Sequence, residues 1–196
     1  MAFASMASCS GSRAAIYTGL STHENDGYGL FLELIAFKYG RMRTSAPQVF
    51  NGIGYESGIL ILTERWQVVE GLEMWTPDEV EASRFVQDLS AARQELAKYY
   101  RPIHRMDQGI GLVLEALERQ GLADETLILF LSDNGPPFVN PKTTLYDVGM
   151  RLQFIVRVPG KDAGAIPLNM SSYIDVFLTL LDSVGQGNRQ PSDACV

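Results

Sequence analysis

Two oxygen-bearing side chains stand next to each other in Ser132-Asp133-Asn134-Gly135, directly after the apolar run TLILFL at 126–131. The run is typical of a strand buried in a parallel sheet, and open α/β sheets bind ligands beyond the carboxyl ends of their strands. A carboxylate and an amide at that place are hard oxygen ligands suited to calcium or magnesium. The alternative is an ordinary strand-to-loop turn, because Asp, Asn and Gly all favour turns.

A lysine stands eight residues beyond Asn134, in the stretch Pro141-Lys142-Thr143-Thr144-Leu145-Tyr146. Lysines in loops are most often simply solvated. Next to a metal ion, however, the ammonium group of Lys142 would hold an anionic oxygen of a substrate.

A cysteine and an arginine stand near the amino terminus, in Cys9-Ser10-Gly11-Ser12-Arg13. We expect a short helix from about Ser12 to Leu20, ended by Gly19. A cysteine just before the start of a helix lies in positive dipole potential, which favours an anion by about 0.3–1 kcal/mol. Arg13 would add to that potential and approach an anion directly. The alternative is an ordinary free cysteine, because such cysteines are activated only in suitable surroundings.

The elements around these residues alternate between helix and strand. Thr76-Pro77-Asp78-Glu79 has the residue types and spacing of a capping box, and we expect it to begin a long helix. Apolar residues then recur in steps of three and four from Phe85 to Leu117. Pro102 is expected to kink or divide this helix, and Gly121 to end it.

A second strand is predicted at Gln153–Val158, before Pro159-Gly160. Ser172-Tyr173-Ile174-Asp175 opens a last helix, whose apolar face comprises Ile174, Phe177, Leu178 and Leu181. The residues from 30 to 71 show no pattern that separates helix from strand. Helix, strand, loop, strand and helix in this order predict a layered α/β domain.

The composition is that of a folded protein without a nucleic-acid or membrane surface. The chain has 196 residues, 46% of them hydrophobic and 20% charged, with a net charge of −7. An acidic chain without a basic cluster is not expected to bind nucleic acid or anionic membranes. Its two cysteines, Cys9 and Cys195, do not make a disulfide framework. Neither a signal peptide nor an apolar run of about 18 residues is recognisable.

Taken together, these segments resemble the sulfatase family of the alkaline-phosphatase-like superfamily. Cys9-Ser10-Gly11-Ser12-Arg13, followed by Thr18-Gly19, is similar to the family signature C-x-P-S-R-x-x-x-x-T-G. Residues 100–134 are similar to the family's helix and strand that lead to its Asp-Asn metal ligands. Further similar stretches are Tyr28-Gly29-Leu30, Gly135-Pro136-Pro137-Phe138, residues 142–146, Arg157-Val158-Pro159-Gly160 and residues 173–182, and the first two point to the sulfamidase (heparan N-sulfatase) branch.

The resemblance implies a mostly parallel sheet flanked by helices, of the alkaline-phosphatase-like type but incomplete. Residues 1–184 would form a partial sulfatase domain, made of a nucleophile-helix segment (1–30), a divergent segment (31–75) and a helix–strand segment with the metal ligands (76–184). Residues 185–196 would be a loose tail. Members of the family are often lysosomal or secreted, whereas this sequence itself indicates no compartment.

The resemblance also implies a reaction, the hydrolysis of a sulfuric ester or a sulfamate in a sulfated small molecule or glycan. A formylglycine-generating enzyme would oxidise Cys9 to formylglycine, whose hydrated aldehyde attacks sulfur. Arg13 would stabilise this nucleophile and Lys142 would contact the sulfate group. Asp133 and Asn134 would be calcium ligands.

Several family features have no counterpart in this sequence. The family's opening strand with paired aspartates is not found, Ile61-Leu62-Thr63-Glu64-Arg65-Trp66 replaces its Lys-x-His step, and Gly11 replaces the proline of its signature. Asp133 and Asn134 alone fall short of the roughly 6–8 oxygen ligands of calcium, and a lost general acid costs about 10²–10⁴ in rate. We therefore expect weak activity or none, from a sulfatase truncated at its amino end and in its middle.

Two alternatives to a working sulfatase follow from these departures. One is a catalytically dead relative, either a truncated gene product or a binding module. The other is a phosphoesterase of the same superfamily. Cys9 argues against the phosphoesterase, because those enzymes usually carry Ser or Thr as the nucleophile.

Overall fold

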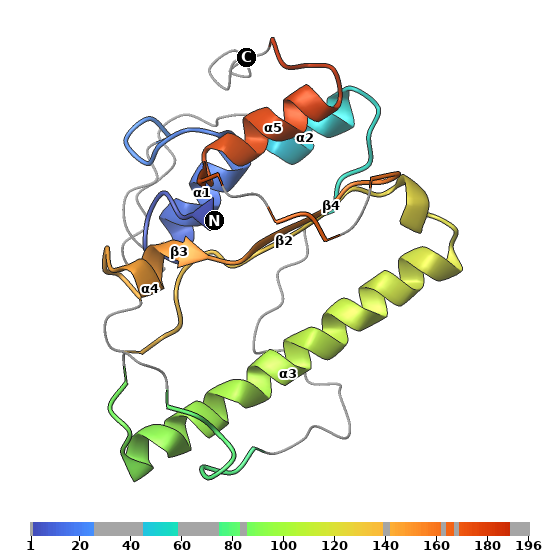
Figure 1. Ribbon diagram of the computed structural model, residues 1–196. Coiled ribbons are helices and arrows are strands. Elements are labelled where there is room, and N and C mark those ends of the chain that lie inside the picture. The colour runs from blue at the N-terminus through green and yellow to red at the C-terminus, as the bar shows by residue number, and fades with distance from the viewer. Residues whose placement is uncertain are drawn as a thin grey trace, which may run out of the picture. The chain divides into compact units, whose positions relative to one another are not determined.

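The computed structural model describes residues 2–25, 45–58, 75–82, 86–138, 142–161, 164–166 and 169–188 (Figure 1). The chain divides into two compact units: the first comprises Met1–Gly58, Leu129–Val156 and Ala163–Val196, and the second comprises Ile59–Ile128 and Arg157–Asp162. The expected single partial domain over residues 1–184 stays a prediction. The apolar stretch 31–37, the stretch 61–66 and most of the tail from 185 onward lie outside the described residues.

The described strands of the first unit form two small groups. β1 (Ala2–Phe3) lies between β3 (Arg151–Leu152) and β5 (Ser171–Ser172), antiparallel to β3 and parallel to β5. In this register Ala2 pairs with Leu152 on one side and with Ser171 on the other. β2 (Ile128–Leu131) lies beside β4 (Phe154–Arg157). The α/β class is thus supported, but the expected mostly parallel sheet is not confirmed.

Gln153 is the single residue between β3 and β4. Its carbonyl oxygen accepts the N–H of Ser132 at 3.3 Å and the hydroxyl of Tyr173 at 3.2 Å. Both donors lie outside a regular strand ladder, so the carbonyl is satisfied by irregular backbone and by a side chain. The two groups of strands therefore meet where β2 ends, which is the place that carries Asp133.

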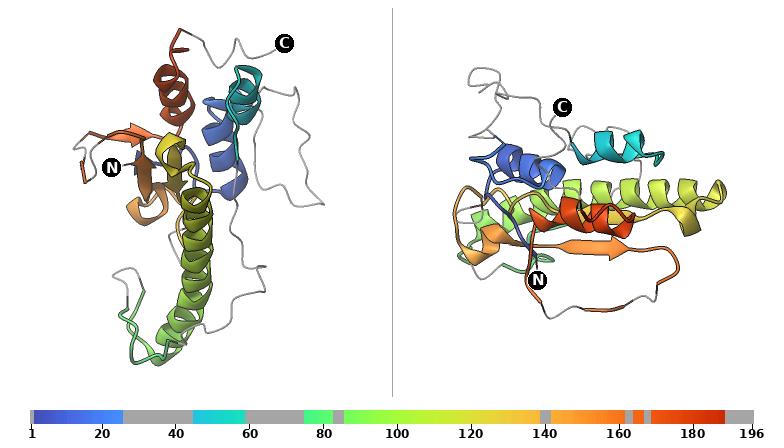
Figure 2. Two further views of the ribbon diagram at one scale, coloured as in Figure 1. Left: turned by 90° about the vertical axis from the view of Figure 1, so that its right-hand side faces the viewer. Right: turned by 90° about the horizontal axis from the view of Figure 1, so that it is seen from above.

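Three helices of the first unit lie together on one side of its strands (Figures 1 and 2). They are α1 (Cys9–Thr18), α2 (Ala46–Gly52) and α5 (Asp175–Ser183). α1 contacts both α2 and α5. Its buried positions include the small residues Ala14 and Ala15, which let the neighbouring elements pack closely against it. A short fourth helix, α4 (Asp147–Met150), leads directly into β3.

Apolar side chains of α5 hold the helices and strands of this unit together. Phe177 and Leu181 pack with Ala46 and Val49 of α2. A second cluster of buried residues contains Ala2, Ala4, Ile16, Leu152, Tyr173 and Val176. The last helix therefore buries the predicted Phe177 and Leu181, whereas Leu178 is only half-buried.

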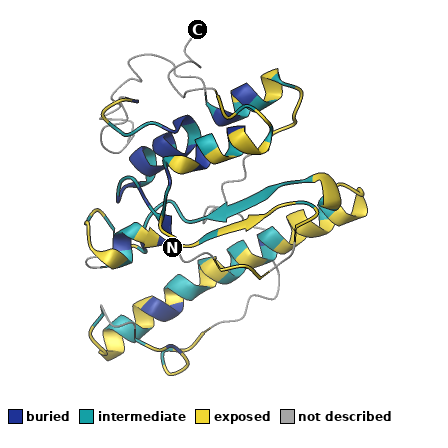
Figure 3. Ribbon diagram, turned by 45° about the horizontal axis from the view of Figure 1, so that its top comes forward, coloured by how far each residue is buried: buried dark blue, intermediate teal, exposed yellow. Residues whose placement is uncertain are grey.

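The paired strands β2 and β4 differ in how far they are covered (Figure 3). Every residue of β2 is half-buried, although the sequence predicts a strand buried on both faces. Ile155 and Val156 follow each other in β4 and so point to opposite faces. They are 61% and 43% exposed, so β4 is open on both of its faces.

Helix α1 begins at Cys9, three residues before the predicted start at Ser12. Ser8 is the N-cap residue, with extended backbone angles, and Ser12 N–H donates to the Ser8 carbonyl at 2.9 Å. The prediction was wrong because Gly11 and the polar residues around it are weak helix formers. Gly19 ends the helix as predicted, with a φ of 65° and its N–H bonded to the Ala15 carbonyl at 2.8 Å.

The long helix of the second unit, α3 (Ser90–Arg119), begins much later than Thr76. The capping-box contact itself is present, because Glu79 Oε2 accepts from the Thr76 N–H at 2.8 Å. It closes an isolated turn instead of a helix. Arg93, in the first turn of α3, donates to the Val80 carbonyl at 2.9 Å, and Val80 is 1% exposed. The turn and the start of α3 are therefore joined by a contact that no local pattern contains.

The proline and the glycine that were expected to interrupt and to end α3 have different effects. The helix is continuous through Pro102, so the expected division does not occur. Gly121 has a φ of 70°, and Leu122 N–H donates to the Leu117 carbonyl at 2.9 Å, which is the Schellman ending that glycine favours. No helix within the described residues is long and apolar enough to cross a membrane.

The packing of α5 can be tested with two leucines. Leu181 is 1% exposed, whereas Leu145 is 84% exposed. We expect Leu181→Ala to lower the free energy of unfolding by about 2–5 kcal/mol, because it leaves a cavity. Leu145→Ala should change it by about 0.5 kcal/mol or less. Urea unfolding followed by circular dichroism measures both, and equal losses would contradict the assigned core.

Candidate functional site

An ion pair joins the first helix to the end of β2. Arg13 Nε donates to Asp133 Oδ2 at 2.5 Å, and the two residues lie 120 positions apart in the sequence. The Asp133 side chain is 22% exposed and that of Arg13 40% exposed. Partial burial strengthens such a contact relative to one fully in water. The two segments that the sequence singled out for chemistry are therefore in contact.

Cys9 is the first residue of α1 and stands one helical turn before Arg13. Residues four apart lie on the same face of a helix, so Cys9 and Arg13 share the face that approaches Asp133. The thiol of Cys9 is free, and the residue is half-buried. The first turn of α1 contains no acidic side chain that would oppose a bound anion.

The loop that carries Lys142 is tied to the chain just before Cys9. Thr143 N–H donates to the Ala7 carbonyl at 2.9 Å. Thr143 has a φ of 64°, a left-handed conformation that is costly for a β-branched residue. Its hydroxyl donates to the Lys142 carbonyl at 2.6 Å. These contacts place the backbone of Lys142, a half-buried residue, next to the start of α1.

Asp133 and Asn134 by themselves do not fit a calcium or magnesium ion. Asp133 already accepts from Arg13, and the Asn134 amide nitrogen donates to the Gly135 carbonyl at 2.6 Å. Among the residues that the structure describes, no three His, Cys, Asp or Glu side chains come together as a metal site. Calcium takes about 6–8 oxygen ligands, so two are too few.

Sequence reasoning missed Tyr173 as a residue of this site. Its hydroxyl donates to the Ser132 carbonyl at 2.8 Å, directly before Asp133. Burial raises the pKa of the Tyr173 phenol, and the nearby charge of Asp133 raises it further. The sequence offered only a helix start at this place, and Asp175 does cap the Ser172 N–H at 3.0 Å as that pattern predicts.

Three buried hydroxyls surround the start of α1. Within the described chain, the Oγ atoms of Ser5, Ser8 and Ser12 are buried and have no hydrogen-bond partner. Buried polar groups without a partner are uncommon in native proteins. Their concentration beside Cys9 distinguishes this segment from ordinary packed core.

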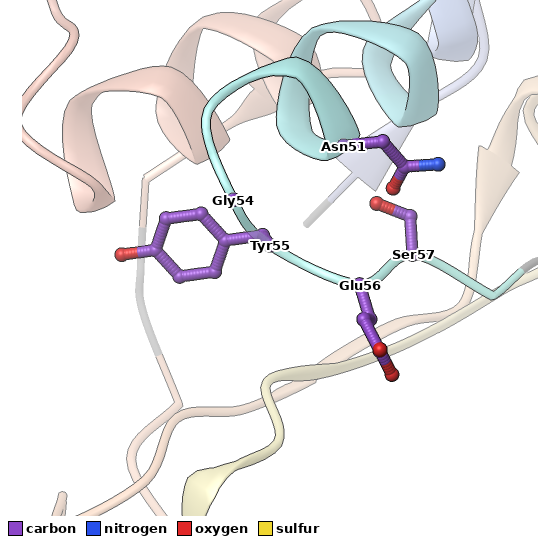
Figure 4. Close-up of a pocket in the computed structure, with 5 residues that line it drawn as sticks. All are labelled: Asn51, Gly54, Tyr55, Glu56 and Ser57. Atoms are coloured by element: carbon purple, nitrogen blue, oxygen red, sulfur yellow. The ribbon is translucent and has the colours of Figure 1, made fainter.

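A surface hollow at the end of α2 does not belong to this site. It is lined by Asn51, Gly54, Tyr55, Glu56 and Ser57 (Figure 4). The side chains of Asn51 and Ser57 lie toward each other, whereas those of Tyr55 and Glu56 point away from them. Ligand sites usually combine enclosure with convergent polar groups, and this exposed stretch lacks the enclosure.

Comparison with known proteins gives a consistent result. The sulfatase family model matches residues 73–186. Human N-sulphoglucosamine sulphohydrolase is 26% identical over 262 residues, which cover 92% of this chain and 52% of that protein. An ulvan-active sulfatase of Formosa agariphila is 32% identical over 107 residues, covering 54% and 18% of the two chains. Human N-acetylgalactosamine-6-sulfatase is 28% identical over 136 residues, covering 62% and 26%.

The chain spans about half the length of the human sulphohydrolase that it resembles. The alignment of 262 residues is also longer than this chain of 196. That relative therefore contains residues inside the aligned region that have no counterpart here. This agrees with the expectation that a central segment of the family is missing.

The packing around Gly11 predicts that the Met6 side chain leaves no room for a larger residue at position 11. Gly11 precedes the first hydrogen bond of α1, so a proline there removes no helical donor. A Cβ at Gly11 would, however, lie 2.2 Å from Met6 Sδ and 3.2 Å from Thr22 Cγ2. We expect Gly11→Pro to lower stability by about 1–3 kcal/mol through overpacking. Adding Met6→Ala should recover part of the loss.

Urea unfolding of the wild type, both single variants and the double variant measures this coupling. If the double variant lost the sum of the two single effects, Met6 would not be the residue that requires glycine at position 11.

Proposed function

This chain belongs to the sulfatase family, and we propose that it carries part of the active site of a sulfuric ester or sulfamate hydrolase. Its contact between Arg13 and Asp133 is the observation that supports this assignment best. The contact brings the C-x-x-S-R helix to the Asp-Asn strand end, and those are the two segments with the strongest resemblance to the family.

The residues of this site have distinct proposed roles. Cys9 would supply the nucleophile after a formylglycine-generating enzyme has oxidised it to formylglycine. Arg13, on the same helical face, would stabilise that group and its developing negative charge. Lys142 would hold an oxygen of the sulfate group, and the bond from Thr143 to Ala7 supports this role because it places the Lys142 loop beside α1.

The proposed substrate is a sulfated small molecule or glycan. The names of the relatives refer to N-sulphoglucosamine, ulvan and N-acetylgalactosamine 6-sulfate chemistry. A chain with a net charge of −7 repels an anionic substrate at long range. Local cations such as Arg13 and Lys142 would therefore decide whether a sulfate group binds.

We further propose that this form of the chain has little or no turnover. The sequence contains two histidines, His23 and His104, and no pair of adjacent aspartates. His23 lies beyond the carboxyl end of α1, and His104 lies within α3, where Gln108 contacts its ring at 3.1 Å. Neither histidine belongs to the segment between residues 55 and 75, where the family's general acid–base step would be expected. That segment contains neither histidine nor lysine.

A sulfate-binding protein without turnover is the second candidate. It is favoured by the pairing of Asp133 with Arg13, because the guanidinium neutralises the carboxylate that a metal ion would otherwise need. We also propose that the fold is the alkaline-phosphatase-like architecture of the family, with a mostly parallel sheet and helices on both faces.

Turnover is the direct test of the first candidate. We expect hydrolysis of 4-nitrocatechol sulfate or a sulfamate to be equal in the wild type and in Cys9→Ala, with calcium present. The reason is that residues acting as a unit lose their effect together when most are absent. Conversion of Cys9 to the aldehyde is verified first by mass spectrometry. A rate clearly above that of Cys9→Ala would contradict the inactive form and support a complete catalytic set.

Calcium binding tests whether Asp133 and the residues around it can hold the metal ion that the family uses. We expect no change in the thermal unfolding midpoint up to about 1 mM calcium, the weak end of protein calcium sites. Asp133→Asn serves as the matched control, because it removes the carboxylate that calcium would need. A saturable stabilisation in the wild type that disappears in Asp133→Asn would contradict the absence of a metal site.

A further inference from the structure

Tyr173 contacts the strand that precedes α1 through its backbone and the end of β2 through its side chain. It is completely buried, and its ring centroid lies 6.2 Å from that of Phe154. Its N–H donates to the Phe3 carbonyl of β1 at 3.0 Å. Its hydroxyl donates to the Ser132 carbonyl at 2.8 Å and approaches the Gln153 carbonyl at 3.2 Å.

The bond to Ser132 acts on Asp133 through the peptide plane. A peptide unit is planar, so the orientation of the Ser132 carbonyl also sets the direction of the Asp133 N–Cα bond. The Asp133 side chain starts from that Cα and ends at Arg13, 2.5 Å from Nε. A rotation of the Ser132 peptide would therefore move the carboxylate relative to the guanidinium.

The backbone hydrogen bond from Tyr173 to Phe3 bears on the position of Arg13, the partner of Asp133. β1 leads through residues 4–8 into α1, which carries Arg13. Tyr173 thus holds the strand that precedes Arg13 and the strand end that precedes Asp133. The Tyr173 side chain itself is completely buried, in the apolar cluster with Ala2, Ile16 and Val176.

We propose that Tyr173 is the positioning residue that sets the orientation of Asp133 toward Arg13. It acts through the Ser132 peptide and does not touch the substrate. The role rests on the proposed function, because it concerns the same two side chains. A phenylalanine at this position would fill the core equally well but would leave the Ser132 peptide free to rotate.

The test follows the Arg13 Nε–H resonance in ¹H–¹⁵N spectra of wild type and Tyr173→Phe. Arg93 provides an internal reference, because its Nε donates to Asp88 Oδ1 at 2.5 Å in the second unit. We expect Tyr173→Phe to shift the Arg13 resonance and to make its hydrogen exchange about threefold to tenfold faster, the range expected for one lost hydrogen bond. The Arg93 resonance should stay unchanged. Assignments come from Arg13→Lys and Arg93→Lys.

Tyr55→Phe is the matched control, because Tyr55 is 53% exposed and far in sequence from the site. It should leave the Arg13 resonance unchanged. An unchanged Arg13 resonance in folded Tyr173→Phe would overturn the proposal and reduce Tyr173 to a packing residue.

A second measurement covers the case in which Tyr173→Phe does not fold. 3-Fluorotyrosine is incorporated at position 173, and its ¹⁹F resonance is recorded in chains with and without Asp133→Asn. A shift is expected, because the two groups are coupled through Ser132, and no shift would overturn the proposal. Neither spectrum requires turnover, so this test is independent of the hydrolysis assay, and a failure of the proposed function is distinguishable from a failure of this inference.

Discussion

The ion pair between Arg13 and Asp133 is the interaction on which the proposed site depends. Apolar packing holds helices and strands together, but it has no direction and tolerates small shifts of one element against another. A charged hydrogen bond between a guanidinium and a carboxylate requires a defined geometry. A carboxylate that is only 22% exposed would also be costly without a partner. The pair therefore fixes the first helix against the end of β2 and removes that cost.

The elements that were predicted correctly are those whose pattern is contained in a few neighbouring residues. The end of α1 at Gly19 and the end of α3 at Gly121 both follow from the left-handed conformation that glycine adopts easily. The strand before Asp133 and the buried face of α5 follow from runs of apolar side chains. The position of Asp133 at a strand end was likewise predictable, whereas its partner was not.

The features that were missed depend on residues far apart in the chain. α3 begins only at Ser90, and Arg93 in its first turn binds Val80 and Asp88, contacts that a capping motif at Thr76 cannot reveal. β1 has only two residues, too few for any periodicity. α2 is a different case, since Ser45 and Gln48 make a capping-box contact at 2.7 Å that local reasoning could have found. Tyr173 was seen only as part of a helix start, because the carbonyl that it binds belongs to another segment.

The left-handed backbone of Thr143 gives the Lys142 loop a built-in tendency to detach. A strained residue raises the free energy of the attached state, and a strain of about 1–3 kcal/mol offsets much of what one hydrogen bond contributes. The bond from Thr143 to the Ala7 carbonyl therefore holds the loop with little net stability. A displacement of the chain just before Cys9 would break this bond. The strain at Thr143 would then be relieved, and the backbone of Lys142 would no longer be held beside the start of α1.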